Sequence, residues 1–157
     1  MLHGDIGSAK DRAGNYDIVT MFDVIEHVPD PSADIRAIRD LLKPNGLFIL
    51  STPNIDGLFP RLSLPFAKLL DYWPHPEPPH HLYQFSVKTM SAMLEANGFE
   101  TVQTHHTKID LAYSFGTPKS WRVSPKMLAY AIAFAPSALI GPLIRSGDWF
   151  YMVGRKA

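Results

Sequence analysis

The fold is decided by residues 16–52, which read YDIVTMFDVIEHVPDPSADIRAIRDLLKPNGLFILST. The stretch begins with a short, β-branched and almost continuously apolar run at 16–22. Such a run is typical of a strand that is buried on both faces of a parallel sheet. A second run of the same character covers 47–52. The two runs predict two buried strands.

The residues between these runs predict a helix. Pro31 suits a first helical position, and either Asp30 or Ser32 can cap the helix. Apolar residues then recur at helical spacing, namely Ile35, Ile38, Leu41 and Leu42. Residues 43–46 (KPNG) end the helix, because proline disfavours the helical conformation in the residue before it and Gly46 tolerates a turn. A strand, a helix and a strand within about 40 residues form a βαβ unit, so the sequence predicts an α/β fold with a mostly parallel sheet.

The regular pattern stops between residues 53 and 79. This segment is rich in proline, with Pro60, Pro65, Pro74, Pro76, Pro78 and Pro79. So many prolines disfavour a regular core element. The segment is therefore interpreted as an insertion or a lid.

The pattern resumes with a capped helix and two strands. Ser86 can cap a helix that ends at 97–98 (Asn-Gly) and carries four apolar residues on one face, Val87, Met90, Met93 and Leu94. Residues 99–104 predict a strand near a sheet edge. Residues 149–153 predict a final strand, followed by the basic tail 154–156.

Residues 127–144 form a stretch of 18 residues without a charged side chain. A stretch of that length is long enough that a membrane span must be considered. Pro136, Gly141 and Pro142 interrupt the stretch. The favoured interpretation is one or two short apolar helices that pack over the sheet or roof a substrate pocket. Contact with a membrane surface is the second interpretation, and a true span is the third.

Composition narrows the class of protein. The chain has 157 residues, of which 46% are hydrophobic, and this suffices for one domain with one core. The 15 basic residues balance the 15 acidic ones, so no general field draws the molecule to nucleic acid. No cysteine is present, which excludes disulfides and thiolate sites and fits a cytoplasmic protein. The start of the chain lacks the features of a secretory signal, so export is not expected.

Polar residues with catalytic potential follow the first predicted strand. Ligands of an open parallel sheet gather beyond the carboxyl ends of its strands, and here those residues are 23–27 (DVIEH). Two carboxylates and an imidazole provide hydrogen-bond acceptors, a general base and oxygen and nitrogen ligands for a metal. The alternative is structural: Asp23 caps the next turn, and Glu26 and His27 are solvated loop residues.

Two blocks of sequence resemble a known family. The first is 22–31 (FDVIEHVPDP), continued by 41–47 (LLKPNGL) and 51–54 (STPN); the second is 80–86 (HHLYQFS), leading to 94–99 (LEANGF). In this order and separation they resemble class I S-adenosylmethionine-dependent methyltransferases, and especially the branch with the ubiquinone-biosynthesis O-methyltransferases. The resemblance implies a Rossmann-like sheet flanked by helices, with an antiparallel last strand.

The resemblance also implies roles for particular residues. Asp5 and Ile6 match the loop that meets the adenine of the cofactor, and Met21, Phe22 and Asp23 match the strand end along its methionine part. In ubiquinone-related members, the positions of Asp23, Glu26 and His27 are Glu, Glu and His that bind a metal, so a divalent ion such as Mg²⁺ is a further implication. Asp23 has a shorter side chain than Glu.

His27 and His81 are the candidates for the base that removes the acceptor proton. The residues His75, Glu77, His80 and His81 also suggest a metal clamp. The prolines among them hold that stretch extended, which favours a lid instead.

The glycine-rich turn that the family carries after its first strand has no counterpart, since no G-x-G occurs in the sequence. Residues 2–6 resemble the end of the family's third strand. The sequence therefore predicts one methyltransferase domain over 1–157 that lacks its first strands.

The predicted function is methyl transfer to a small molecule, and the family resemblance favours oxygen as the acceptor atom. The apolar stretch 127–144 favours an apolar or aromatic acceptor, with peripheral membrane contact as an option. The alternative is a catalytically inactive remnant that acts as a binding module and oligomerises through its exposed sheet edge.

Overall fold

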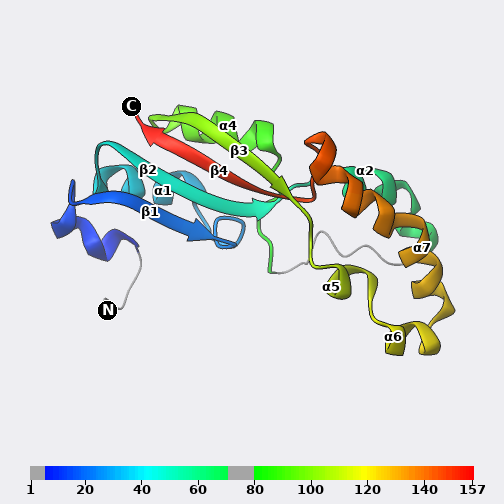
Figure 1. Cartoon of the computed structure of the whole chain (residues 1–157). Coiled ribbons are helices and arrows are strands. Elements are labelled where there is room, and N and C mark those ends of the chain that lie inside the picture. The colour runs from blue at the N-terminus through cyan, green and yellow to red at the C-terminus, as the bar shows by residue number, and fades with distance from the viewer. Residues whose placement is uncertain (1–5, 71–79) are drawn as a thin grey trace.

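The structure is a computed structural model, and it describes residues 6–70 and 80–157. Its centre is a four-stranded sheet in the order β1-β2-β4-β3 (Figure 1). The strands are β1 (Tyr16–Phe22), β2 (Leu42–Pro53), β3 (Phe99–Thr107) and β4 (Trp149–Lys156). β1 and β2 are parallel, and β4 runs antiparallel to both β2 and β3. The sequence prediction of a mixed α/β sheet with an antiparallel last strand is confirmed.

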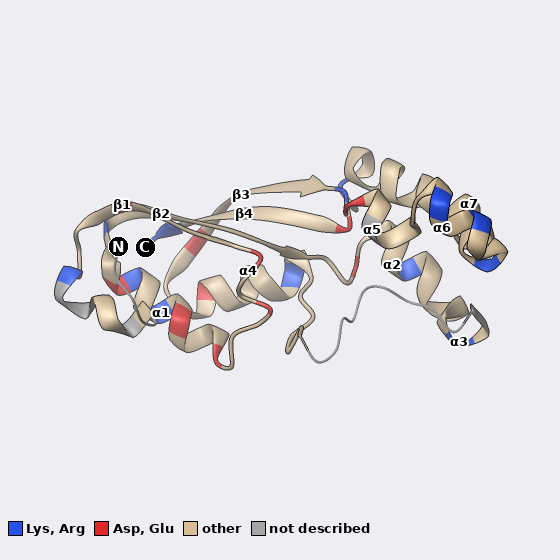
Figure 2. Cartoon of the chain, turned by 90° about the horizontal axis from the view of Figure 1, so that it is seen from below, with Lys and Arg blue, Asp and Glu red and all other residues tan. Residues whose placement is uncertain are grey.

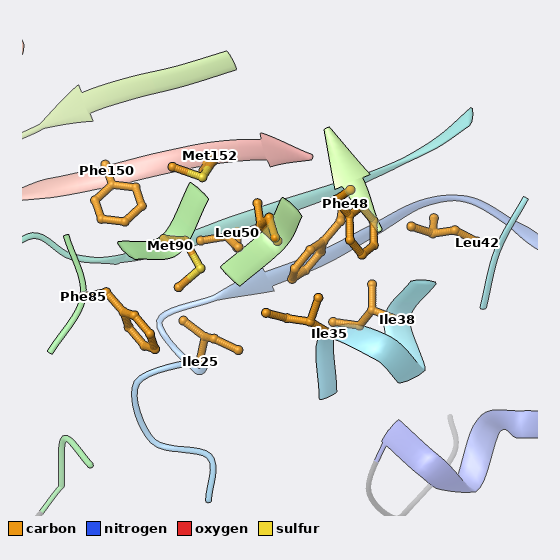
Figure 3. Close-up of a cluster of buried hydrophobic side chains, with 12 residues drawn as sticks. Ile25, Ile35, Ile38, Leu42, Phe48, Leu50, Phe85, Met90, Phe150 and Met152 are labelled. Atoms are coloured by element: carbon orange, nitrogen blue, oxygen red, sulfur yellow. The ribbon is translucent and has the colours of Figure 1, made fainter. Parts of the chain in front are cut away.

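One face of the sheet is covered by α1 (Pro31–Leu41) and α4 (Val87–Ala96), which lie on the same side in Figure 2. The 3-10 helix η1 (Ile6–Arg12) packs against α1. Side chains of both helices and of β2, β3 and β4 meet in one core (Figure 3), and Tyr16, Val19 and Met21 of β1 pack against it. Its fully buried members are Ile25, Ile35, Ile38, Leu42, Phe48, Leu50, Met90, Leu94, Phe150 and Met152. We call these strands and helices, with η1, the sheet lobe.

Local chemistry explains where the two helices begin and end. Asp30 caps α1, since its Oδ1 accepts a hydrogen bond from the Ala33 N–H at 2.9 Å. Ser86 caps α4 through a reciprocal capping box with Thr89. Gly98 then turns the chain with a φ of +84°, which only glycine adopts freely. After α1 the left-handed residue is Asn45, not the Gly46 to which the sequence argument assigned the turn.

The prediction that β1 is buried on both faces was wrong. Ile18 is 52% exposed and Phe22 is 49% exposed. The reason is that β1 is an edge strand among the described residues and that α1 and α4 cover only one face of the sheet. β4 is also longer than predicted, because Gly154, Arg155 and Lys156 continue the strand, and the Lys156 ammonium donates a hydrogen bond to the Leu42 carbonyl at 2.7 Å.

The remaining helices gather beyond the ends of β2 and β3 (Figure 1). They are α2 (Leu58–Ser63), η2 (Leu64–Phe66), α3 (Ala67–Leu70), α5 (Leu111–Phe115), α6 (Pro118–Val123), α7 (Pro125–Ile140) and η3 (Gly141–Ile144). We call this group the helical lobe. A second core joins α2 to α5 and α7, and consists of Phe59, Ile109, Phe115, Tyr130, Ala131, Phe134 and Ala138.

Two expectations about this region need correction. The segment 53–79 was expected to contain no regular core element, yet α2 forms there and Phe59 is fully buried, because its ring packs on Phe115 at 4.7 Å. Residues 71–79 of the expected lid, with His75 and Glu77, lie outside the described residues. The apolar stretch 127–144 is helical, but it reaches the sheet mainly at its end: α7 packs on α2, α5 and α6, whereas η3 contacts β3.

A buried polar junction connects the two lobes. The Asn54 side chain donates a hydrogen bond to the Gly147 carbonyl at 2.7 Å, and the Phe59 N–H donates to Asp148 Oδ1 at 3.2 Å. A Cβ on Gly57 would lie 2.8 Å from the Asp148 Cα, so the two chain segments approach closely only because residue 57 is glycine. Burial raises the pKa of Asp148 to about 7, because an ionised carboxylate is poorly solvated at 0% exposure.

Candidate active site at the end of β1

Asp23 is the first residue after β1, and two hydrogen bonds fix its carboxylate. Oδ1 accepts from the Ser51 hydroxyl at 2.6 Å and from the Trp149 indole N–H at 2.9 Å. Among the described residues, no hydrogen bond reaches Oδ2. The backbone has a φ of 56°, a conformation that non-glycine residues seldom adopt and that recurs at ligand sites. The strand end thus presents one oriented carboxylate oxygen.

Glu26, three residues after Asp23, is buried, and only 1% of its surface is exposed. Its Oε2 accepts a hydrogen bond from the Thr52 hydroxyl at 2.9 Å, whereas Oε1 has no hydrogen-bond partner among the described residues. Burial raises the pKa of this carboxyl, and the hydrogen bonds of Glu26 and the nearby His27 and His81 oppose that rise. A buried carboxylate oxygen without a partner, near two imidazoles, indicates a site for a proton or a cation.

His27 has a defined tautomer. Its Nδ1 lies 2.7 Å from the His80 carbonyl oxygen, which can only accept, so Nδ1 carries the hydrogen. The lone pair of a neutral His27 is therefore on Nε2, which lies 3.9 Å from Glu26 Oε1. His81 stacks obliquely on His27, with ring centroids 4.8 Å apart. An imidazole whose Nδ1–H is fixed by a backbone carbonyl keeps the lone pair of Nε2 available, as a general base requires.

Three residues of this cluster also form a candidate cation site. One ligand atom each from Glu26, His27 and His81 lies within 4.8 Å of the others. A carboxylate and two imidazoles suit Zn²⁺ or a similar ion better than Mg²⁺, which prefers oxygen ligands. The set differs from the expected Asp23, Glu26 and His27, because Ser51 and Trp149 hold the Asp23 carboxylate outside the group.

The other residues predicted to bind the cofactor do not lie together in the structure. Met21 packs against the buried core, whereas Phe22 lies on the opposite face, with its ring 5.8 Å from that of Tyr151 in an edge-on contact. Ile6 packs against the core and lines, with Ala33 and Ala37 of α1, a cavity of about 420 Å³. Asp5 lies outside the described residues. Of the predicted residues, Asp23, Glu26, His27 and His81 gather at the end of β1.

The sequence argument missed the residues that orient these side chains. Ser51 and Thr52 end β2, and a search of every strand end would have found them. Trp149 is 126 positions from Asp23 and reaches it only because β4 inserts beside β2. The His80 carbonyl could not have been found from side-chain identity. Pairing of distant strands, rather than local pattern, decides these contacts.

The fold and the site together define a class of protein. β1, β2 and β3 are parallel and β4 alone is antiparallel between β2 and β3, with polar residues gathered beyond the carboxyl ends of the parallel strands. This is the partial Rossmann-like sheet of class I S-adenosylmethionine-dependent methyltransferases. Residues 4–104, more than half of the chain, match the family described as methyltransferase domain, and the chain belongs to that family.

Comparison with known proteins agrees with this assignment. The chain is similar to ubiquinone biosynthesis O-methyltransferases of Xanthomonas axonopodis pv. citri (54% identity over 46 residues) and Marinobacter nauticus (50% over 50 residues). These matches cover 29% and 32% of this chain but only 19% and 21% of the relatives. A solved methyltransferase from Archaeoglobus fulgidus shares the fold with a TM-score of 0.56 at 16% identity; the match covers 99% of this chain and 66% of that one.

Proposed function

We propose that the chain carries the acceptor side of an S-adenosylmethionine-dependent methyl transfer to a hydroxyl oxygen of a small molecule. The observation that carries the proposal is the cluster of Glu26, His27 and His81 next to the oriented Asp23 carboxylate. Family membership supports methyl transfer, and the names of the matched relatives support oxygen as the acceptor atom.

The residues at the end of β1 fit the methionine moiety of the cofactor. The free side of the Asp23 carboxylate suits the ammonium of the methionine moiety, and the half-exposed rings of Phe22 and Tyr151 offer an apolar surface beside it. When bound, S-adenosylmethionine supplies a methyl group that its sulfonium already activates. The protein then needs to orient the acceptor and remove its proton.

His27 is the proposed base. With S-adenosylmethionine bound, its Nε2 would take the proton of the acceptor hydroxyl that receives the methyl group. The resulting imidazolium keeps its hydrogen bond to the His80 carbonyl, and the Glu26 carboxylate at 3.9 Å stabilises its charge. A cation held by Glu26, His27 and His81 would instead lower the pKa of a bound hydroxyl. The apolar rings at the strand end favour an aromatic or apolar acceptor.

Calorimetric titration of the full 157-residue chain with S-adenosylhomocysteine tests cofactor binding. We expect micromolar binding, and we expect Asp23→Asn to weaken it by about tenfold or more, since a hydrogen bond to a charged group contributes about 1.5–3 kcal/mol. Asp17→Asn, at the other end of the same strand, is the matched control and leaves affinity unchanged. A folded chain that releases no heat would contradict cofactor binding by these residues.

Variants of His27 distinguish a role of this residue as a base from a role in stabilising the fold. Asn at position 27 can still donate to the His80 carbonyl but has no equivalent of Nε2. His27→Asn should therefore retain cofactor affinity and stability while methyl transfer to a simple phenol falls by roughly 10²–10⁴-fold. Adding Zn²⁺ or Mg²⁺ to both proteins shows whether a cation takes part. Unchanged transfer by His27→Asn would remove His27 from the reaction.

A non-catalytic binding module is the second candidate, and one observation favours it. β1 pairs only with β2 in the described sheet, and Ile18 and Phe22 are half exposed on the uncovered face. An open strand of this kind can pair with another chain. Self-association of a chain that binds no cofactor would favour this candidate.

A further inference from the structure

The two lobes differ in charge. The helical lobe, over residues 57–70 and 111–147, contains six basic residues and no acidic residue. The six are Arg61, Lys68, Lys119, Arg122, Lys126 and Arg145, and all are exposed. Figure 2 shows the same separation, with blue segments and no red ones on α2, α6 and α7. Because the whole chain is neutral, the rest of the molecule carries the balancing acidic excess.

The helix α7 has two apolar faces. Tyr130, Ala131, Phe134 and Ala138 are buried against α2 and α5. At 100° per residue, Leu128, Ile132 and Leu139 fall on a second face, about a third of a turn around the helix from the buried one. Ile132 is 69% exposed there, and Leu143 of η3 is 83% exposed. The outer face of α7 is therefore apolar without being part of the core.

More apolar surface surrounds this face. Further exposed side chains of the helical lobe are Leu62, Leu64, Phe66, Leu69, Val123, Ile140 and Ile144. A groove of about 400 Å³ between α7 and the α5–α6 segment is lined almost wholly by apolar groups, among them Phe115, Trp121 and Ile132. Apolar surface of this extent, with basic side chains and no acidic ones, marks an interaction site.

We infer that the helical lobe docks on the surface of an anionic lipid bilayer. In this arrangement the outer face of α7, with Leu128, Ile132 and Leu139, enters the interfacial region, and the six basic residues contact lipid phosphates. The positive charge of the lobe favours an anionic bilayer over a second copy of the chain, because pairing two copies of the same face would bring like charges together. This inference goes beyond the proposed methyl transfer and does not depend on it.

The packing of α7 favours lying in the interface over crossing the bilayer. Residues 125–144 are long and apolar enough to cross a membrane by length and composition, and 33% of the most apolar window is buried inside the protein. One face of α7 is held by Phe59 and Phe115 of the helical core. Within four residues of η3 the chain enters β4, which pairs with β2 and β3. These contacts keep the helix attached to the protein along its length.

Flotation of the full chain with lipid vesicles tests the inference. We expect binding to mixed phosphatidylcholine and phosphatidylglycerol vesicles, and at least about tenfold weaker binding to phosphatidylcholine alone, since each basic residue near an anionic surface contributes on the order of 1 kcal/mol. Raising the salt from about 0.1 M to about 1 M should release the chain, because the screening length falls from about 10 Å to about 3 Å. Equal binding to both vesicle types, or no binding, would overturn the inference.

Paired variants locate the surface. Ile132→Ser with Leu143→Ser, and separately Lys119→Glu with Lys126→Glu, should each reduce vesicle binding by about tenfold. Ile18→Ser and Lys88→Glu are the matched controls, since both residues are exposed on the sheet lobe, and they should bind as the parent does. Circular dichroism establishes that every variant is folded. A double serine variant that binds vesicles normally, but loses a dimer seen for the parent, would assign the face to a second copy and overturn the inference.

Discussion

The sheet lobe and the helical lobe use their apolar side chains differently. The sheet lobe buries its large side chains between a sheet and two capped helices, and its register is set by pairing across β1, β2, β4 and β3. The helical lobe consists of short helices around a cluster of aromatic rings and leaves many apolar side chains exposed. The first arrangement follows from local periodicity, whereas the second depends on contacts between distant segments. The candidate active site belongs to the sheet lobe, at the carboxyl end of β1, and the surface that we propose to face lipid belongs to the helical lobe.

Core truncation should show how independent the lobes are. Phe59→Ala removes a ring that packs on Phe115, Tyr130 and Phe134, and Phe48→Ala removes a ring that packs on Phe99. Each should cost about 3–5 kcal/mol of local or global stability. In hydrogen exchange, Phe59→Ala should increase exchange in α2, α5 and α7 but leave the strands protected. Loss of protection throughout the chain in that variant would show that the lobes unfold as one unit.

The junction should make stability depend on pH. The pKa of Asp148 is about 7 in the folded chain because of burial, whereas an unfolded aspartate titrates near its ordinary value of about 3.9. Between these values the folded chain holds a proton that the unfolded chain has lost. The free energy of unfolding therefore falls as the pH rises from about 4 to about 7.

Asp148→Asn tests this sign. The variant keeps an acceptor for the Phe59 N–H and has no charge to bury, so at pH 8 it should be more stable than the parent by about 2–4 kcal/mol, and near pH 4 the two should agree. Urea unfolding across this range is the measurement. Asp56→Asn, an exposed neighbour, should show no comparable gain. A parent whose stability does not change relative to Asp148→Asn would contradict the raised pKa.

Sequence reasoning was most successful where structure is local. The cap at Ser86 and the turn at 97–98 were predicted, and Asp30 was one of two candidate caps for α1, because each feature depends on a few neighbouring residues. The exposure of β1 was not predicted, because an apolar strand has the same sequence pattern whether one or both of its faces are covered. That α7 packs mainly on other helices was not predicted for a similar reason, since an uncharged helix does not specify its partner.

The candidate site follows the same division. Asp23, Glu26 and His27 were found from their position after a strand, and His81 from a family resemblance. The hydrogen bond from Trp149 to Asp23 and the orienting His80 carbonyl were not found, because they depend on strand order and backbone path. The candidate cation set contains His81 instead of the expected Asp23, and this difference also depends on strand order and backbone path.

Helix caps offer a matched pair of smaller changes in the two lobes. Ser86 caps α4, and Ser124 caps α7 by accepting a hydrogen bond from the Met127 N–H at 3.3 Å. Ser86→Ala and Ser124→Ala should each cost about 1 kcal/mol. Ser86→Ala should shift the thermal transition of the sheet lobe, and Ser124→Ala should act on α7 alone if the lobes are independent. Equal shifts of a single transition would argue for one cooperative unit.

Ile18→Lys should have the smallest effect on stability and should show whether the open edge of β1 is used. Ile18 is half exposed on the uncovered face, so the change should alter the free energy of unfolding by no more than about 0.5 kcal/mol. Lysine on an edge strand opposes pairing with another chain. If the edge associates, light scattering should show an oligomer of the parent chain that dissociates in Ile18→Lys and persists in Ile132→Ser. A parent chain that stays monomeric at high concentration would remove the edge as a binding surface, and the apolar face of α7 would then be the chain's main candidate for contact with a partner.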